Sequence, residues 1–471
     1  MGVEMARITS VPCDGETTTY VSPPKLRVAR ALARLPRLGD TVGLMLDPTF
    51  YLFEKYLRHG PVFTVKMPYQ TYTVLAGSEA ATFMSSKDGR ECLTVGSSWR
   101  FVEEQFGGKD SLVAVDGPQH KQWRTLLQRG YSREAIADRY SEAIDVIDDA
   151  VDKHWRPGES VPVLPAMQKL SIAQVGTFLG GVRPTDDDIE DIALVTREIL
   201  KIAPVQHIPK FMLQLPRYVN ARSRVARVAQ NALALAGHSS ASGHRGQSTL
   251  LEDILESCRD DPDAANQRNM LFHSVLPYFA GVETTSATAT YALYLILRHP
   301  DVLCRIQDEV AVMFERGDIT HDSLFHSTPV LHGAIMEAMR LRPIASFIIR
   351  VAAKDFEFHG HQIRSGEGVF IGTTVPHFLS EFYENPMKFD VDRYGDSVGP
   401  NRTPGAYSPF GRGPHMCVGK GLAESLMQLM LARIIHRRTL ELSSRSYRLS
   451  NRVSSSSPSP KFAVRVVSSR R

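Results

Sequence analysis

Residues 410–419 of this chain read FGRGPHMCVG and present one cysteine, Cys417, in a glycine-rich loop immediately before a long helical pattern. Backbone N–H groups and the positive end of the helix dipole favour a thiolate at such a place. Gly413 and Gly419 suit a bulky planar group that must approach the backbone, because a side chain would obstruct it. A cysteine in an arbitrary loop is more often buried and inert, so its interpretation depends on the surrounding pattern.

That pattern, FxxGxxxCxG with a histidine two residues before the cysteine, resembles the haem-binding loop of the cytochrome P450 superfamily. The resemblance implies that Cys417 is the axial thiolate ligand of the iron of haem b and favours O–O cleavage by pushing electron density onto it. It also implies that His415 meets a haem propionate. Phe410, Gly413 and Gly419 would complete the cofactor-binding loop.

A second match lies in the helical pattern at 264–297, where residues 280–285 read AGVETT within an apolar stretch. Thr284 can turn its hydroxyl toward the carbonyl of Ala280, one turn back, and open the helix locally to admit water or O2. An isolated Glu–Thr pair is more often a solvated helix face. The family has an (A/G)Gx(D/E)T motif, so the resemblance implies that Glu283 feeds protons and that Thr284 positions them.

A third match concerns charged residues that we predict to be structural. The segment EAMRLRP places Glu337 and Arg340 three residues apart, which by itself indicates only a local salt bridge. In the family, an ExxR pair joins a later arginine, here Arg393 of FDVDRY, and holds the loop that leads to the cysteine. Bidentate geometry makes such a buried triad tolerable. Val391 and Tyr394 stand where proline and phenylalanine are common, and neither change removes a charge.

A fourth group of residues is suited to bind carboxylates. The segment DGPQHKQWRTLL places His120 and Arg124 four residues apart on one helical face, and Arg350 follows in FIIRVAAKD. The resemblance implies that all three bind haem propionates, because two carboxylates beside a low-dielectric cavity need several cationic donors. Without the resemblance, each is an ordinary surface cation.

The 471 residues are 43% hydrophobic and 23% charged, which is typical of a globular enzyme. Helical patterns predominate, at 132–152, 186–202, 210–235, 264–297, 300–316, 330–340 and 419–437. Strand patterns occur at 62–75, at 347–371 and in the final KFAVRVV, and the clearest loop is 237–248. We predict a mainly α fold with a minor β-sheet region. The resemblance begins near Thr49 and implies the cytochrome P450 fold, with a single haem-enclosing domain at 41–471 after an N-terminal extension at 1–40.

Composition excludes several other classes. A net charge of +4 with scattered Lys and Arg argues against a nucleic-acid partner. Five widely spaced cysteines without a CxxC pair fit a reducing compartment. The N-terminus shows neither a signal peptide nor the roughly 20 apolar residues of a spanning helix, so we expect a cytoplasmic protein. Residues 26–37, LRVARALARLPR, could touch a membrane surface, although a solvated helix face is the simpler interpretation.

The resemblance implies a monooxygenase that inserts one oxygen atom from O2 into a small hydrophobic substrate. No GxGxxG fingerprint or FMN-like domain is present, so electrons are expected from a ferredoxin or flavodoxin with its reductase. A basic face for such an acidic partner is one interpretation of Lys121, Arg412, Lys420 and the cluster at 433–438; an ordinary solvated surface is the other.

By resemblance, the substrate pocket is lined by segments at 92–112, 196–212 and 344–348 and by the hairpin tip near Ser455. The pocket residues that we single out are Phe272, Leu276, Phe279, Ala280, Ile344 and Phe347. Because most are apolar or small, they favour a terpenoid, steroid, fatty acyl chain or polyketide of the kind found in secondary metabolism.

Three alternatives remain open at this stage. A haem-thiolate peroxygenase or isomerase needs no external electrons, but such enzymes commonly lack the acid–Thr pair that this chain has. A haem sensor or carrier would bind haem without turnover. A haem-free protein would use Cys417 as a nucleophile or zinc ligand and would show no Soret absorption.

Overall fold

The computed structural model describes residues 36–470 apart from 69, 97–98, 129, 203–209, 243–247, 260–266, 318, 396–398, 444–448 and 450–456. The segment 26–37, for which membrane contact was the alternative to a solvated helix face, therefore lies almost wholly outside the described residues, and Ser455 lies outside them too. The chain divides into two compact units. We call residues 1–94, 336–416 and 450–457 the sheet unit, and residues 95–335, 417–449 and 458–471 the helical unit. The division crosses helix α17 (Pro329–Leu341) and falls between Met416 and Cys417.

A five-stranded sheet in the order β1-β2-β8-β5-β3 organises the sheet unit. Its strands are β1 (Val62–Lys66), β2 (Thr71–Ala76), β3 (Leu93–Thr94), β5 (Ile348–Ala352) and β8 (Gly368–Gly372). β1 and β2 form an antiparallel hairpin, whereas β2 and β8 run parallel, with Tyr72 opposite Gly368. The central strand β8 is apolar and buried along its whole length, as expected of a strand covered on both faces.

Short helices and a second hairpin complete the sheet unit. They are α2 (Pro36–Leu46), α3 (Pro48–His59), α4 (Ser78–Phe83), α5 (Lys87–Cys92), η3 (Val375–Phe378), η4 (Val391–Tyr394), η5 (Pro400–Arg402), β6 (Phe356–Phe358) and β7 (His361–Ile363). The side chain of Asp47 caps α3 by accepting from the Phe50 backbone N–H, and Pro48 occupies its first turn. The apolar core of this unit includes Leu75 and Ile371.

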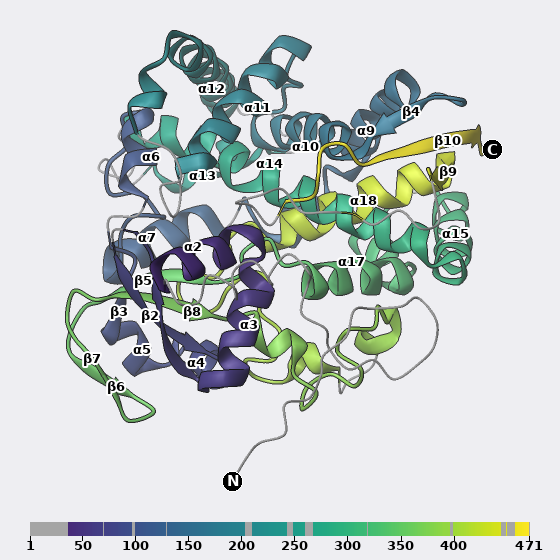
Figure 1. Cartoon of the computed structure of the whole chain (residues 1–471). Coiled ribbons are helices and arrows are strands. Elements are labelled where there is room, and N and C mark those ends of the chain that lie inside the picture. Colours follow the sequence, from purple (N-terminus) through teal and green to yellow (C-terminus); the bar gives the residue numbers. More distant parts are fainter. Residues whose placement is uncertain are drawn as a thin grey trace. The chain divides into compact units, whose positions relative to one another are not determined.

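The helical unit contains the long helices of the chain. Its helices are α6 (Arg100–Gln105), α7 (Gly117–Gln128), α8 (Arg133–Ala137), α9 (Tyr140–His154), α10 (Val163–Gly180), α11 (Asp186–Ile202), η2 (Lys210–Gln214), α12 (Pro216–Ser242), α13 (Leu250–Ser257), α14 (Gln267–Arg298), α15 (Pro300–Glu315), α16 (His321–His326) and α18 (Lys420–Arg437). The 32-residue helix α14 packs against α10, α12 and α18 within this unit (Figure 1). A small sheet in the order β4-β10-β9 is formed by β4 (Ser160–Pro162), β9 (Arg438–Leu442) and β10 (Ala463–Ser469).

Local sequence explains several of these helices. Three aspartates occupy the first turn of α11, where the helix dipole favours negative charge. Thr249 and Glu252 form a capping box at the start of α13. Gly181 ends α10 in the left-handed region at φ 68°, a conformation that costs glycine little.

The predicted mainly helical architecture with a minor sheet is confirmed. Helices α11, α15 and α18 begin and end within one residue of the predicted patterns, and the final strand β10 is present. The predicted helix at 132–152 is instead two helices, α8 and α9. The predicted loop at 237–248 is wrong in its first half, because α12 continues to Ser242. None of the helices in the described residues is long and apolar enough to cross a membrane.

Candidate functional site

Cys417 lies in the helical unit, just before α18. It is a free thiol with surface open to solvent. Gly419, the N-cap residue of α18, donates its backbone N–H to the sulfur. A Cβ added to Gly419 would lie 3.6 Å from Cε1 of Tyr131 and 4.0 Å from the Cys417 sulfur. Tyr131 and Gly419 therefore lie beside the thiol, and a Cβ on Gly419 would make only ordinary van der Waals contacts there.

The charge balance at Cys417 only partly follows the sequence expectation. Burial raises the pKa of the thiol, while the Gly419 N–H, Arg124 and Lys420 lower it and Glu424 raises it. Cys417 has exposed surface as a residue, yet protein surrounds its sulfur. This burial is why the pKa of the thiol is raised overall. The favourable groups expected at the helix N-terminus are present, but burial outweighs them for the free thiol. A bound metal ion would reverse this balance by deprotonating the sulfur.

Helix α7 brings two of the predicted propionate ligands into the same unit as Cys417. His120 is buried at 4% exposure. Burial lowers the pKa of Arg124, and the charge of Cys417 opposes that shift, which places this guanidinium within electrostatic range of the thiol. Their role toward propionates stays a prediction.

Residues 410–416 of the cysteine loop lie in the sheet unit, and the structural reason for the glycines there differs from the one expected. Gly411 and Gly413 both have positive φ, at 70° and 73°. A Cβ on Gly413 would lie 2.7 Å from the carbonyl oxygen of Met84, at the end of α4. The close approach at Gly413 is thus to backbone, and the planar group inferred from the sequence is not needed to explain this glycine.

Three other predicted cofactor-binding residues lie in the same unit. His415 and Phe410 are half-buried in the loop. Arg350 lies on β5, is 9% exposed and donates through Nη1 to the carbonyl of Ile349 at 2.8 Å. Their contact with haem stays a prediction.

The predicted structural triad is assembled in the sheet unit. Arg340 makes a bidentate pair with Glu337, from Nε to Oε1 at 2.6 Å and from Nη2 to Oε2 at 2.8 Å. Both side chains are fully buried, and Nε of Arg393 lies 3.6 Å from Oε2 of Glu337. Although burial opposes charge on Arg340, its hydrogen bonds and the charge of Glu337 raise its pKa. Such pairing is what a buried ion pair requires.

The triad is connected through His377 to Ser408, two residues before the cysteine loop. Arg340 Nη1 donates to the His377 carbonyl at 2.8 Å, and the ring Nε2 of His377 accepts from the Ser408 backbone N–H at 3.1 Å. Because Nε2 accepts, the proton belongs on Nδ1, which faces the Arg340 carbonyl at 3.3 Å. Burial and the charge of Arg340 lower the pKa of His377 to about 3, so the ring is neutral. The sequence patterns did not reveal His377.

The acid–Thr motif lies on α14. Thr284 is exposed and donates its hydroxyl to the carbonyls of Ala280 at 2.9 Å and Gly281 at 3.2 Å. The first of these bonds is the one expected from the sequence. Glu283 is half-buried and accepts at Oε2 from Nε2 of Gln168 on α10. Gln168 is a second residue that the sequence patterns did not reveal, since it lies 115 residues from its partner.

The predicted pocket residues of α14 fall into two groups. Phe272 is 0% exposed and packs against Gly108, and Phe279 packs against Phe106 with ring centroids 5.0 Å apart. Leu276 and Ala280 keep accessible surface, on the helix face that also carries Thr284. In the sheet unit, Ile344 and Phe347 are half-buried. Part of the predicted segment 196–212 lies outside the described residues.

The predicted basic face is reduced by internal ion pairs. Arg433 makes two hydrogen bonds of 2.7 Å to Asp148 on α9, and Arg437 pairs with Asp148 and Asp152. Arg438 is buried and pairs with Asp152 at 2.8 Å. These three arginines hold α18 and β9 to α9, which accounts for their clustering without a partner protein. Lys121 and Lys420 are exposed.

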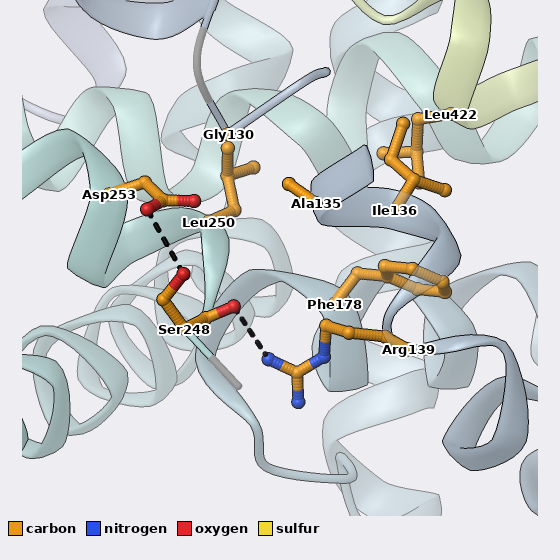
Figure 2. A pocket seen from close by; sticks show the side chains of 9 residues that line it. All are labelled: Gly130, Ala135, Ile136, Arg139, Phe178, Ser248, Leu250, Asp253 and Leu422. Carbon is orange, nitrogen blue, oxygen red and sulfur yellow. Dashed lines mark hydrogen bonds between the residues drawn. The ribbon is translucent and has the colours of Figure 1, made fainter. Parts of the chain in front are cut away.

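Figure 2 shows a small pocket in the helical unit, bounded by the segment after α7, by α8, α10, α13 and α18, and by Arg139, which precedes α9. Its polar wall consists of Arg139, which donates to the Ser248 carbonyl at 3.4 Å, and of Ser248, whose hydroxyl donates to Asp253 at 3.0 Å. Arg139 also pairs with Glu142. The polar groups of this wall mostly bond to one another, and Nε of Arg139 has no hydrogen-bond partner among the described residues.

The described residues contain no group of three or more His, Cys, Asp and Glu side chains that could hold a metal ion. A metal held by one protein side chain, as Cys417 would hold iron, does not need such a group.

Comparisons with known proteins agree on one family. The family model described as cytochrome P450 matches residues 33–465. Cytochrome P450 26A1 of Danio rerio is 24% identical over 413 residues, which cover 85% of this chain and 82% of the relative. The structure is similar to the cytochrome P450DA heme domain, with a TM-score of 0.76, 22% identity and 96% of each chain covered. It is also similar to the retinoic acid bound cyanobacterial CYP120A1, with a TM-score of 0.73, 20% identity and coverage of 90% of this chain and 95% of the other.

Proposed function

The chain belongs to the cytochrome P450 family and is a haem monooxygenase, and we propose that it inserts one oxygen atom from O2 into a small hydrophobic substrate with electrons from an external redox partner. The single observation that carries the proposal is the placement of Cys417 at the start of α18, flanked by Gly419 and Tyr131 and within charge range of Arg124. A cysteine that has exposed surface and a cation within charge range of its sulfur would suit a ligand of haem iron.

The residues of this chain fit haem b. Cys417 would be the thiolate ligand, and His120, Arg124, Arg350 and His415 would bind the propionates. Phe410, Gly413 and Gly419 would complete the loop around the thiolate. Once bound, the haem would supply the activation of O2, and a thiolate ligand favours cleavage of the O–O bond. The triad of Glu337, Arg340 and Arg393 would keep the loop rigid without touching the reacting atoms.

Glu283 and Thr284 would move protons. Thr284 has an accessible hydroxyl that already bridges to the carbonyls of Ala280 and Gly281, so it can pass a proton while keeping a fixed orientation. Glu283 is half-buried beside it in sequence and can take a proton from water. A carboxylate and a hydroxyl in succession form a short relay, as general acid–base catalysis requires.

A hydrophobic substrate is supported by the open face of α14. Leu276 and Ala280 present apolar surface next to Thr284, and Ile344 and Phe347 add apolar side chains in the sheet unit. Apolar walls with few polar groups are typical of sites for hydrophobic ligands. A solved relative binds retinoic acid, which is consistent with a terpenoid, steroid, fatty acyl or polyketide substrate.

The electron donor would be a ferredoxin or flavodoxin with its reductase. In the helical unit, the exposed Lys121 and Lys420 would face the acidic partner, and Lys420 also lies 3.9 Å from the carboxylate of Glu424. Charge complementarity of this kind raises the rate of encounter more than the affinity. The free, scattered cysteines support a cytoplasmic location, and we assign residues 41–471 to one haem-enclosing domain after an extension at 1–40.

The test begins with the purified protein and its Cys417→Ser variant. The wild type should show the thiolate-type Soret absorption of a ferrous carbon monoxide complex and should oxidise an apolar substrate with a generic ferredoxin and reductase. The variant should lose the thiolate-type band. If the variant kept it, the assignment of Cys417 would be wrong.

A second experiment separates the monooxygenase from a peroxygenase or a haem carrier. Thr284→Ala should release peroxide and lower the yield of product per electron consumed, because the hydroxyl of the relay is lost. A peroxide-driven enzyme would work without the reductase, and a carrier would show no turnover in either protein.

A further inference from the structure

Two donors on helix α12 meet one acceptor on helix α6. Tyr218 and Arg222 lie four residues apart and therefore share one face of α12. The hydroxyl of Tyr218 donates to Oε1 of Gln105 at 3.4 Å, and Nη1 of Arg222 donates to the same oxygen at 3.1 Å. Tyr218 is 2% exposed, whereas Arg222 and Gln105 are half-buried. We call these three side chains the Gln105 cluster.

Arg222 is a half-buried cation whose bonded acceptor is neutral. Within the part of the chain that the structure describes, it forms no ion pair, and its hydrogen bond goes to an amide oxygen. The acids of α6 are placed elsewhere: Glu103 is buried and accepts from the Ser111 backbone N–H at 2.6 Å, and Glu104 is exposed. A guanidinium has five N–H donors and matches a carboxylate in bidentate geometry. Arg222 therefore retains donors for an anion.

The charges around Tyr218 keep its hydroxyl protonated. Burial raises the pKa of Tyr218 well above its usual value, the charge of Arg222 lowers it, and the charge of Glu198 on α11 raises it. Glu198 lies 3.7 Å from Nε of Arg197, so a cation partly balances its charge. The Gln105 cluster thus presents a neutral O–H donor beside a guanidinium.

The Gln105 cluster borders the apolar surface that the substrate is proposed to use. Phe106, the residue after Gln105, packs against Phe279 of α14 with ring centroids 5.0 Å apart, and α12 packs against α14. Leu276 and Ala280 supply accessible apolar surface on α14. A ligand with its hydrocarbon on this surface would place a charged end in the half-buried cluster, where the cost of desolvating a paired charge is lower than in the core.

We propose that the substrate is an apolar carboxylic acid, whose carboxylate replaces the amide oxygen of Gln105 as the acceptor for Arg222 and Tyr218. This inference rests on the proposed monooxygenase function and narrows its substrate class. A carboxylate accepts two parallel bonds from arginine, which bind it more strongly than the present single bond to a neutral amide. The released amide of Gln105 can turn its own N–H groups toward the ligand. Arg222 and Tyr218 determine specificity and take no part in oxygen transfer.

The first test compares acids with their methyl esters by calorimetric titration of the haem-loaded protein. The probes are palmitic, abietic and lithocholic acids, which represent the acyl, terpenoid and steroid classes, each below its micelle-forming concentration. At least one acid should bind about 10- to 100-fold more tightly than its ester, the range expected for hydrogen bonds to a charged group. If no acid binds, or if every ester binds as tightly as its acid, the proposal is wrong.

The second test removes the donors one at a time. Arg222→Met should weaken binding of the acid about 10- to 100-fold and leave binding of the ester unchanged. Tyr218→Phe should weaken the acid about three- to tenfold, because one neutral donor is lost. Arg227→Met, at an exposed position of the same helix, is the matched control and should keep the full preference for the acid. An acid preference that survived in Arg222→Met would place the carboxylate elsewhere and overturn the proposal.

Gln105→Glu distinguishes a ligand site from a mere tether between α6 and α12. The new carboxylate keeps Tyr218 and Arg222 engaged, so the tether survives, but it takes the place of the ligand's carboxylate. The acid should therefore bind as weakly as it does to Arg222→Met, while the ester binds as it does to wild type. If Gln105→Glu bound the acid like wild type, the site would be only a tether.

Turnover is measured separately, with ferredoxin and reductase, so that the two proposals can fail independently. An acid that binds through Arg222 but is never oxidised would contradict the monooxygenase function and not the acid site. Oxidation of acids and esters with equal affinities would contradict the acid site alone.

Discussion

Tyr394 stands where phenylalanine is expected, and its additional hydroxyl group has a structural role. Its hydroxyl donates to Oε1 of Glu337 at 2.7 Å, in a place where the family commonly has phenylalanine. Asp390 donates its backbone N–H to Oε2 of the same carboxylate at 3.0 Å. The carboxylate of Glu337 thus accepts from neutral donors as well as from Arg340, which offsets the cost of burying it.

We predict that Tyr394→Phe lowers the free energy of unfolding by about 1–2 kcal/mol, because a hydrogen bond to a buried charged group is lost while the ring is kept. Urea unfolding, followed by loss of Soret absorption, measures the change. Tyr72→Phe is the matched control in the same unit, since Tyr72 is half-exposed and stacks on Phe370 through its ring. Equal unfolding midpoints in the two variants would contradict the prediction.

Among single residues, those that lie at a fixed spacing within a short sequence motif could be predicted. Glu337, Arg340, Arg393 and Cys417 could be predicted because short patterns contain them. Contacts between distant segments could not be predicted: Tyr394 lies 57 residues from Glu337, and Gln168 lies 115 from Glu283. No periodicity connects such pairs, and nothing in a single sequence indicates which polar residues will meet.

Helix α10 explains why some elements also escaped prediction. It is buried on nearly all sides from Leu170 to Leu179, so it lacks the alternation of apolar and polar faces by which helices are found in sequence. α11 has an apolar stripe and acidic residues in its first turn, and its bounds were predicted. Helices at the centre of a bundle are therefore the hardest to predict from pattern alone.

The same burial leaves polar atoms of α10 without partners. The hydroxyl of Ser171 has no hydrogen-bond partner among the described residues, although the side chain is 0% exposed. The amide nitrogen and oxygen of Gln174, three residues later, also have no hydrogen-bond partner among the described residues. A buried hydroxyl without a partner costs about 1–3 kcal/mol.

We predict that Ser171→Ala stabilises the protein by about 1 kcal/mol, since it removes that cost and introduces a better helix former. Chemical unfolding of the two purified proteins measures the difference. Ser274→Ala is the matched control on α14, because Ser274 is equally buried but donates to the Met270 carbonyl at 2.7 Å, and it should not be stabilised. A destabilised Ser171→Ala would mean that the hydroxyl holds an ordered water molecule.

For the whole molecule, the class of fold could be predicted and its long-range pairing could not. The order of the motifs and the dominance of helical patterns led to the family. The parallel pairing of β2 with β8 brings Tyr72 opposite Gly368, across nearly 300 residues, and both strands are too short to specify their partners. Hydrophobic alternation shows that a strand exists but does not determine its neighbour.

Three histidines, which are spread over both units, share one electrostatic property. Burial lowers the pKa of His273 and of His377 to about 3, and that of His332 to about 4. In the case of His273, neither ring nitrogen has a hydrogen-bond partner among the described residues. The folded protein therefore keeps these rings neutral, whereas the unfolded chain would protonate them near pH 6.5.

This difference predicts a loss of stability in mild acid. Because the pKa of each ring is lower in the folded state, its contribution is present above pH 6.5 and is lost progressively as the pH falls from 6.5 toward 3. Between pH 7.5 and 5.5 each histidine should lower the free energy of unfolding by about 1.4 kcal/mol, or by about 4 kcal/mol for the three together. Urea unfolding of the haem-loaded protein across this pH range measures the slope. His273→Phe should reduce the slope by about a third, while Tyr72→Phe, which leaves every histidine in place, should retain it. An unchanged slope in His273→Phe would show that this ring is protonated within the fold, with a partner that its neutral form lacks.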